Sequence, residues 1–230
     1  MYRIALATGK VYPLYWVRTG RETDRRVIIR KLQVGTFASN CYIVASEATR
    51  EAMVVDPGAE PDEILRVIRK DGLTVVVIVL THRHLDHVGA AAKVTAATGA
   101  PLAAHVECAR YLPHSPSYVL PPGYEGPPAV DRILAAGDVI EVGELRFTVV
   151  PTPGHTPCGI SLYGEGHVFT GDTLFNYGVG RTDLVDSDYD ALMEGIKERL
   201  LTLPPETVVH PGHGPDSTIA TEIRANPFLK

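Results

Sequence analysis

A layered α/β fold is predicted by three features of the 230-residue sequence. Two groups of short apolar segments, one before residue 106 and one after residue 138, have the length and pattern of strands. Between and after them lie segments with helical periodicity. Glycine- and proline-bearing turns separate these elements. Helices packed on layers of strands accommodate all three features.

The first half of the chain is expected to alternate between strands and helices. One helix is expected at 61–72, where Pro61 opens the segment and Gly72 ends it. A second is expected at 88–99, where small residues would pack closely on the preceding strand. The strands are expected at 27–34, 41–45, 52–55, 73–80 and 101–105.

The second half is expected to contain strands at 139–142, 145–150, 160–163, 167–170 and 207–210, and an amphipathic helix at 188–201. Residues 113–128 contain six prolines and two glycines, so they form neither a helix nor an interior strand. We expect a lid over a site there, with an interdomain linker as the alternative. The whole chain is predicted to be a single domain, in which residues 1–26 form an N-terminal extension. This extension holds several aromatic residues and packs on the domain or on a neighbouring subunit, and the latter would make a homo-oligomer.

Composition excludes several classes of function. The chain has 22 Lys and Arg against 27 Asp and Glu, a net charge of -5, which gives no general attraction to nucleic acid. No apolar stretch approaches the length of a membrane span, and we recognise no export signal. Three scattered cysteines fit neither a disulfide framework nor a thiolate zinc site. We therefore expect a cytoplasmic protein with no nucleic-acid or membrane partner.

The segment THRHLDH, residues 81–87, follows the most apolar expected strand and carries three histidines and one aspartate. His82 and His84 are two residues apart, so an extended chain directs both imidazoles the same way. Asp86 and His87 come where the next helix begins, and Asp86 is expected to cap that helix. By chance this spacing should occur on the order of once in ten thousand such sequences, which favours metal binding over unrelated histidines.

Further metal donors are expected at three other turns that follow strands. His155 lies in PTPGHTP, Asp172 in FTGDTLF, and His213 in HPGHGP. Glycine in each turn permits the close backbone approach that coordination needs. Imidazole and carboxylate donors without thiolate suit zinc, iron or manganese, and this donor set alone leaves the choice open.

Together these motifs resemble the metallo-β-lactamase superfamily. The resemblance runs from about Val27 to the C-terminus and includes NCYIV at 40–44 and VDPG at 55–58. Within the superfamily, GRTDL at 180–184 and the ending GHGPDSTIATEIRANPFL look most like glyoxalase II-like hydrolases. The resemblance implies an αββα sandwich, with two mixed β-sheets flanked by helices and a metal site at one edge of both sheets.

The resemblance also implies a centre of two divalent metal ions, zinc first, with iron or manganese as alternatives. His82, His84 and His155 would hold one ion, and Asp86, His87 and His213 the other. Asp172 would bridge the two. A bridging hydroxide, formed because metals lower the pKa of water toward about 7, would be the nucleophile, and Asp86 would orient it.

The predicted activity is hydrolysis of a small-molecule thioester, such as the acyl-glutathione S-lactoylglutathione. Glyoxalase II carries a C-terminal helical extension that helps to bind glutathione, whereas only residues 214–230 follow His213 here. The thiol carrier is therefore left open, and we expect the 113–128 segment to do part of this work. One alternative is a persulfide dioxygenase with a single iron at His82, His84, His155 and Asp172. Another is a non-catalytic protein whose metals only stabilise the fold.

Other residues near these motifs are open to interpretation, and two of them have alternative roles. Asp56 either accepts a hydrogen bond from a ligating histidine or only caps its turn. Arg181 either orients a negatively charged substrate or pairs with Asp183. Cys158 is expected near the site as a small buried residue rather than a ligand. No site role is predicted for His105, His114 and His167, while His210 is expected to support the site or be structural.

Overall fold

The computed structural model describes residues 27–111 and 129–230. Within these ranges the strands form two six-stranded sheets and one two-stranded ribbon. The predictions for residues 1–26 and 113–128, and for His114, lie outside the described residues. The single-domain organisation stays a prediction.

The first sheet has the order β1-β2-β3-β4-β5-β6. The β1–β2 and β2–β3 pairs are antiparallel, and the following three are parallel. Its strands are β1 (Val27–Val34), β2 (Ser39–Ser46), β3 (Glu51–Val55), β4 (Thr74–Val79), β5 (Leu102–His105) and β6 (Arg132–Leu134).

The second sheet has the order β14-β13-β10-β9-β8-β7. Only the β10–β13 pair is parallel. Its strands are β7 (Val139–Val142), β8 (Leu145–Pro151), β9 (Ile160–Gly164), β10 (His167–Gly171), β13 (Val208–Pro211) and β14 (Ser217–Thr218). The separate ribbon pairs β11 (Leu174–Phe175) with β12 (Gly178–Val179).

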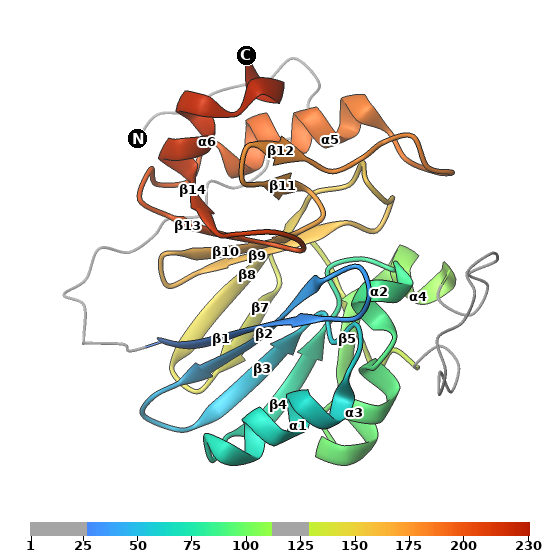
Figure 1. Ribbon diagram of the computed structural model, residues 1–230, viewed down its shortest axis with the longest axis vertical. Coiled ribbons are helices and arrows are strands. Elements are labelled where there is room, and N and C mark those ends of the chain that lie inside the picture. The colour runs from blue at the N-terminus through green and yellow to red at the C-terminus, as the bar shows by residue number, and fades with distance from the viewer. Residues whose placement is uncertain (1–26, 112–128) are drawn as a thin grey trace.

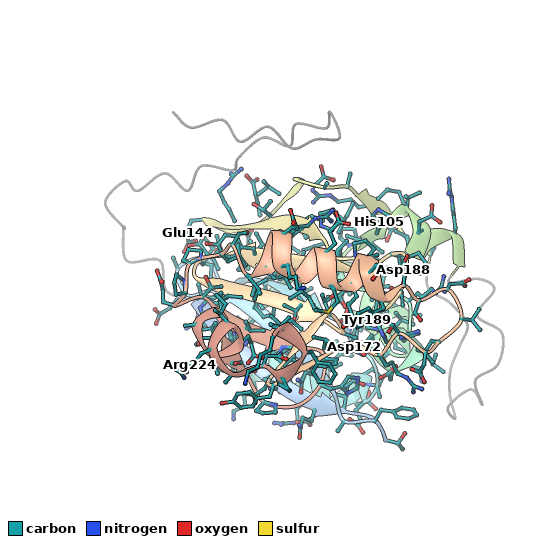
Figure 2. The ribbon with its side chains drawn as sticks, turned by 90° about the horizontal axis from the view of Figure 1, so that it is seen from above. His105, Glu144, Asp172, Asp188, Tyr189 and Arg224 are labelled. Atoms are coloured by element: carbon teal, nitrogen blue, oxygen red, sulfur yellow. The ribbon has the colours of Figure 1, made fainter. Side chains whose placement is uncertain are left out.

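Helices cover the outer faces of both sheets. In Figure 1, α1 and α3 lie against the first sheet, and α5 and α6 lie against the second. Figure 2, seen from above, shows α5 and α6 lying over the second sheet. The helices are α1 (Pro61–Lys70), α2 (Leu85–Val88), α3 (Ala91–Thr98), α4 (Val106–Tyr111), α5 (Tyr189–Gly195) with its π-helical continuation η2 (Ile196–Leu200), α6 (Ile219–Ala225) and the 3-10 turn η3 (Pro227–Leu229).

Three separate apolar clusters show why the layers stack in this order. Alternate residues of one strand enter different clusters, because successive side chains of a strand point to opposite faces. Ile43 packs toward α1 and α3, whereas Val44 packs toward the second sheet. Phe169 lies between the sheets and Val168 packs beneath α5. Both faces of each sheet are thus buried, and the αββα arrangement is confirmed.

The expected helix at 88–99 was wrong in one respect, because the structure divides this region into α2 and α3. The chain turns at Gly89 and Ala90, and the Ala90 backbone N–H donates to the Pro57 carbonyl, 2.9 Å away. A Cβ on Gly89 would lie 2.5 Å from the Gly58 carbonyl oxygen. This close contact between two loops interrupts the helix and fixes α2 beside the end of β3.

The remaining predicted strands and helices agree with the structure to within about two residues at their ends. Seven short elements of the described ranges were not predicted: α4, β6, β11, β12, β14, α6 and η3. None of the helices in the described ranges is long and apolar enough to cross a membrane.

Candidate metal centre

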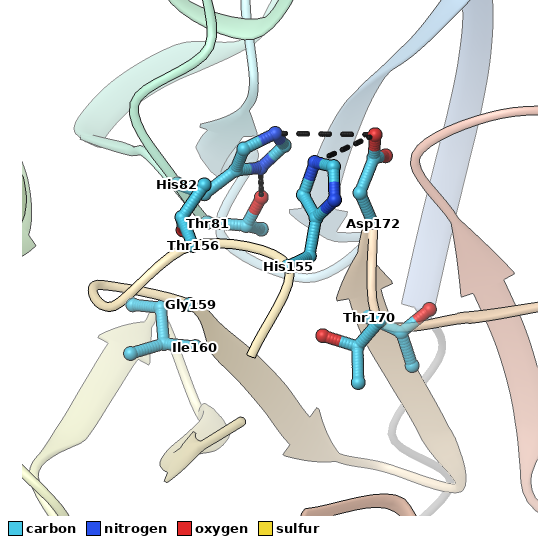
Figure 3. A pocket seen from close by; sticks show the side chains of 9 residues that line it. Thr81, His82, His155, Thr156, Gly159, Ile160, Thr170 and Asp172 are labelled. Atoms are coloured by element: carbon cyan, nitrogen blue, oxygen red, sulfur yellow. Dashed lines mark hydrogen bonds and ion pairs between the residues drawn. The ribbon is translucent and has the colours of Figure 1, made fainter. Parts of the chain in front are cut away.

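The loops that follow β4, β8, β10 and β13 meet at one edge of the two sheets, and they bring all seven predicted donor residues together. His82 and His84 come from the loop after β4, while Asp86 and His87 lie on α2. The other three donors occupy the turns predicted for them: His155, Asp172 and His213. Figure 3 shows His82, His155 and Asp172 converging on one side of this cluster.

The donors form two groups of three. Ligand atoms of His82, His84 and His155 lie within 4.8 Å of one another, and so do those of Asp86, His87 and His213. We call these the first and second triads. In the first triad, Nδ1 of His84 is 2.9 Å from Nε2 of His155.

The second triad is regular. Nε2 of His87 lies 3.3 Å from Nε2 of His213, and Oδ2 of Asp86 lies 3.4 Å and 3.3 Å from these two nitrogens. Donor atoms about 2.0–2.2 Å from one ion in tetrahedral geometry stand about 3.4 Å apart. The spacing of these three atoms therefore fits a shared cation.

Asp172 lies between the triads. Its Oδ1 is 3.4 Å from Nε2 of His87, and its Oδ2 is 3.5 Å from Nε2 of both His155 and His213. Nε2 of His82 is 4.0 Å from Oδ2. One carboxylate thus faces donors of both triads.

Two buried polar atoms of this cluster have no hydrogen-bond partner among the described residues: Nε2 of His82 and Oδ1 of Asp172. Buried polar atoms are normally satisfied, so each unpaired one needs an explanation. Gly212 leaves the space open, since a Cβ there would lie 2.1 Å from Oδ1 of Asp172. The unpaired atoms, the donor types and their spacing all fit divalent metal ions.

A small pocket, too tight to hold a water molecule, adjoins the first triad. Figure 3 shows it between Thr81, His82, Thr156, Ile160 and Asp172. The pocket is lined by four threonines, Thr81, Thr156, Thr170 and Thr173, and the hydroxyl of Thr81 lies 3.0 Å from Nδ1 of His82.

Asp56 holds the inner ends of two loops. This buried carboxylate accepts hydrogen bonds from the Thr81 backbone N–H at 2.7 Å and from the Thr81 hydroxyl at 2.6 Å. Its Oδ2 also lies 3.1 Å from Nδ1 of His87, and the Thr81 hydroxyl lies 3.0 Å from Nδ1 of His82. Asp56 therefore fixes a histidine of each triad, one directly and one through Thr81.

Two other histidines are held by backbone carbonyls. Nδ1 of His155 donates to the carbonyl of Arg181 at 2.8 Å, and Nδ1 of His213 donates to the carbonyl of Phe37 at 3.2 Å. In the neutral form of each imidazole, Nδ1 carries the proton and Nε2 keeps the lone pair that faces the centre. These anchors were not predicted, because any residue can supply a carbonyl.

Asp86 does not cap α2, so this prediction was wrong. His84 occupies the N-cap position in an extended conformation, and Asp86 lies inside the first turn. Its carboxylate instead accepts a hydrogen bond from the Ser39 hydroxyl at 2.8 Å. Ser39 is a further contact that the sequence motif did not reveal.

The other polar residues in question belong to neither triad. The guanidinium of Arg181 forms a bidentate ion pair with Asp183. Cys158 is buried in the apolar cluster under the first sheet. His167 and His210 contact each other at 2.9 Å, and His210 also contacts Asp216. His105 accepts a hydrogen bond from the Glu107 backbone.

The two triads differ in charge. Burial, together with neighbouring imidazoles, holds the pKa of His82 well below its usual range and lowers the pKa of His84 to about 4. Burial acts the same way on His87 and His213, but it is outweighed by carboxylates. Asp172, Asp56 and Asp86 raise the pKa of His87 well above its usual range, and Asp172 and Asp86 raise the pKa of His213 to about 9. At neutral pH the metal-free second triad carries protons, whereas His82 and His84 are neutral.

This difference predicts a pH dependence for the metal-free protein. A raised pKa stabilises the fold most below the unfolded value, 6.5 for His213, and this contribution disappears as the pH rises through about 9. We expect the melting temperature of metal-free protein to fall between pH 6.5 and 9, and to fall less in a His213→Asn variant. Thermal unfolding in chelator across this range checks this, and equal slopes for the two proteins would contradict it.

Comparison with known proteins agrees with this geometry. Residues 34–213 match the Metallo-beta-lactamase superfamily. Hydroxyacylglutathione hydrolase GloC of Haemophilus influenzae is 34% identical over 87% of this chain and 97% of its own. A crystal structure of TTHA1623 in a di-iron-bound form superposes with a TM-score of 0.74 at 36% identity, covering 87% of this chain and all of that one.

The crystal structure of ETHE1 from Myxococcus xanthus superposes with a TM-score of 0.75 at 33% identity, covering 88% of this chain and 84% of that one. The fold, the family match and these relatives lead to one conclusion. The chain belongs to the metallo-β-lactamase superfamily of metallo-hydrolases.

Proposed function

We propose that this protein is a dinuclear metal-dependent thioesterase that hydrolyses an acyl-glutathione, S-lactoylglutathione being the first candidate. The observation that carries the proposal is the complete second triad beside the first, with Asp172 facing both. The similarity to GloC, whose name is hydroxyacylglutathione hydrolase, supports the substrate class.

The donor set accounts for the nucleophile. Two divalent ions bound by these residues would supply a Lewis acid and water that ionises near neutral pH. Asp86 and Asp172 contribute only two negative charges against the four positive charges of the ions, so the centre favours an attacking hydroxide and the oxyanion that develops on the carbonyl. All three cysteines are buried, which agrees with hydrolysis that uses no thiol nucleophile.

The protein side chains orient the reaction. Asp172, only 11% exposed at its side chain, keeps the two triads at a fixed separation. Asp86, held by Ser39, presents its carboxylate at the edge of the second triad, where it can orient the attacking water. A leaving thiolate needs little protonation, so a separate general acid is not required.

The loop that carries Arg181 lies beside His155 of the first triad. Its backbone holds His155, and its guanidinium is exposed beside Asp183. We propose that a carboxylate of the thiol carrier competes with Asp183 for this guanidinium. Arg181 would then pair with Asp183 in the free protein and with the substrate in the complex.

The second triad also separates this proposal from its alternative. A persulfide dioxygenase with one iron would need only the first triad and Asp172. The regular spacing of Asp86, His87 and His213 favours a second ion and therefore the hydrolase. A purely stabilising role for the metals would leave unexplained why Asp86 and His213 are partly open to solvent, at 24% and 30% of their side chains.

The test uses metal-free protein reloaded separately with zinc, iron and manganese. Hydrolysis of S-lactoylglutathione and oxygen uptake on glutathione persulfide are measured on each preparation, together with metal content. We expect thioester hydrolysis with two ions per chain and no oxygen uptake. One iron per chain with oxygen uptake would establish the dioxygenase instead, and folded, metal-loaded protein with neither activity would favour a stabilising role.

A further inference from the structure

We infer that Ser39 is the positioning residue of the second triad and controls whether this triad binds its metal ion. The inference rests on the dinuclear centre proposed above. It concerns a hydroxyl group of this chain that belongs to neither triad.

Each member of the second triad has one anchor outside it. His87 is held by Asp56 and His213 by the carbonyl of Phe37. For Asp86 the anchor is Ser39, whose hydroxyl donates to Oδ2 at 2.8 Å. Without Ser39, no other residue in the described ranges gives the carboxylate of Asp86 an anchor comparable to those of the two histidines.

The hydroxyl contacts the oxygen that matters for coordination. Oδ2 of Asp86 is the atom that lies 3.3–3.4 Å from the two imidazole nitrogens of the triad. A carboxylate oxygen has two lone pairs, so a hydrogen bond from Ser39 occupies one and leaves the other for a cation. The hydrogen bond thus fixes the rotation of the carboxylate and favours coordination through a single oxygen.

The backbone of the same residue fixes the opposite side of the triad. Ser39 forms an isolated β-bridge with His213, and the next residue, Asn40, donates its backbone N–H to the carbonyl of Gly212 at 2.7 Å. Asp86 comes from α2 and His213 from the loop after β13. Ser39 therefore joins two donors from distant parts of the chain through its side chain and its backbone.

Burial makes this contact persistent. Ser39 is 0% exposed, so water does not compete with Asp86 for its hydroxyl. Groups outside the donor set that orient a ligand typically change metal affinity by 10–100-fold when they are removed. A loss of this size, confined to one of two sites, would leave the first triad loaded and the second largely empty.

The experiment measures zinc affinity directly, without substrate. In a His84→Ala background the first triad is broken, so zinc binding reports the second triad. In a His213→Ala background it reports the first. Each background is compared with and without Ser39→Ala by competition with a chromophoric chelator.

We expect Ser39→Ala to weaken zinc binding about 10–100-fold in the His84→Ala background and less than about 3-fold in the His213→Ala background. A merely structural role for Ser39 would weaken both sites equally. The matched control is Ser46→Ala, which removes a second fully buried hydroxyl at the other end of β2, where it donates to Glu144. This control should leave both affinities unchanged.

The inference is overturned if Ser39→Ala leaves the affinity of the second triad unchanged, or weakens both triads alike while circular dichroism shows an intact fold. It is also overturned if the His84→Ala protein binds no zinc at all, a result that would remove the dinuclear centre itself. Zinc binding as expected, in a protein that hydrolyses no thioester, would support the role of Ser39 and reject only the proposed function.

Discussion

Replacing Asp172 with asparagine is expected to reduce thioester hydrolysis by more than about 100-fold, beyond the range typical of groups outside the donor set. The side chain keeps its shape but loses the negative charge that faces both triads at 3.4–3.5 Å. Because both ions would lose a ligand at once, metal content should fall together with turnover. Steady-state kinetics and elemental analysis on one preparation measure the two effects.

Asp190→Asn is the matched control for this variant. It makes the same chemical change at an exposed position on α5 and should leave both readouts unaltered. Full activity in Asp172→Asn, or full metal content with no activity, would show that Asp172 does not bridge the triads.

The second large effect is expected on stability. Asp56→Ala should destabilise the metal-free protein by about 3–5 kcal/mol, because the buried N–H and hydroxyl of Thr81 and the N–H of His87 all lose their acceptor. Asp56 also has a positive φ of 52°, which alanine adopts less readily. Urea unfolding of metal-free protein measures this difference.

Asp56→Asn separates the two causes. Asparagine tolerates positive φ and keeps one acceptor oxygen, so its loss of stability should be about half that of alanine. Asp71→Ala, which breaks a partly exposed ion pair with Arg30, should cost less than about 1 kcal/mol. A loss of that small size in Asp56→Ala would mean that Asp56 does not organise the loops.

The positions of the donors could be predicted because each leaves a local signal. His82, His155, Asp172 and His213 all follow an apolar strand. Because β8, β10 and β13 run in the same direction, the turns after them lie at one edge of the second sheet. The spacing of the histidines in THRHLDH was enough to predict metal binding by imidazole and carboxylate donors. The αββα layering was available only through the family resemblance. The order of the strands within each sheet was not predicted, since apolar alternation does not specify which strands pair.

The contacts that orient the donors left no comparable signal. His155 and His213 are held by the carbonyls of Arg181 and Phe37, which depend on backbone geometry and not on side-chain type. In the sequence Ser39 resembles an ordinary turn residue. Its contact with Asp86 is seen only in the folded chain, where β2 lies beside α2. The expectation that Asp86 caps α2 was wrong, because His84 occupies the N-cap position and the carboxylate of Asp86 accepts a hydrogen bond from Ser39. A tertiary contact thus prevailed over the local capping preference.

The short elements were missed for a related reason. β11, β12 and β14 have only two residues each, too few for a periodic pattern to be recognised. The α6 helix is fixed by its buried Glu222, whose Oε2 accepts from the Asn226 side chain at 2.7 Å and from the Tyr177 backbone at 3.0 Å. A glutamate in an exposed-looking segment predicts a surface position, and only the folded chain shows its partners.

The claim that the two triads hold a pair of cations on either side of Asp172 is tested most directly by anomalous diffraction from crystals grown with zinc. We predict two anomalous peaks about 3.5–4 Å apart, one within bonding distance of His82, His84 and His155 and the other of Asp86, His87 and His213. A single peak at the first triad, with the second triad empty at saturating zinc, would contradict this account.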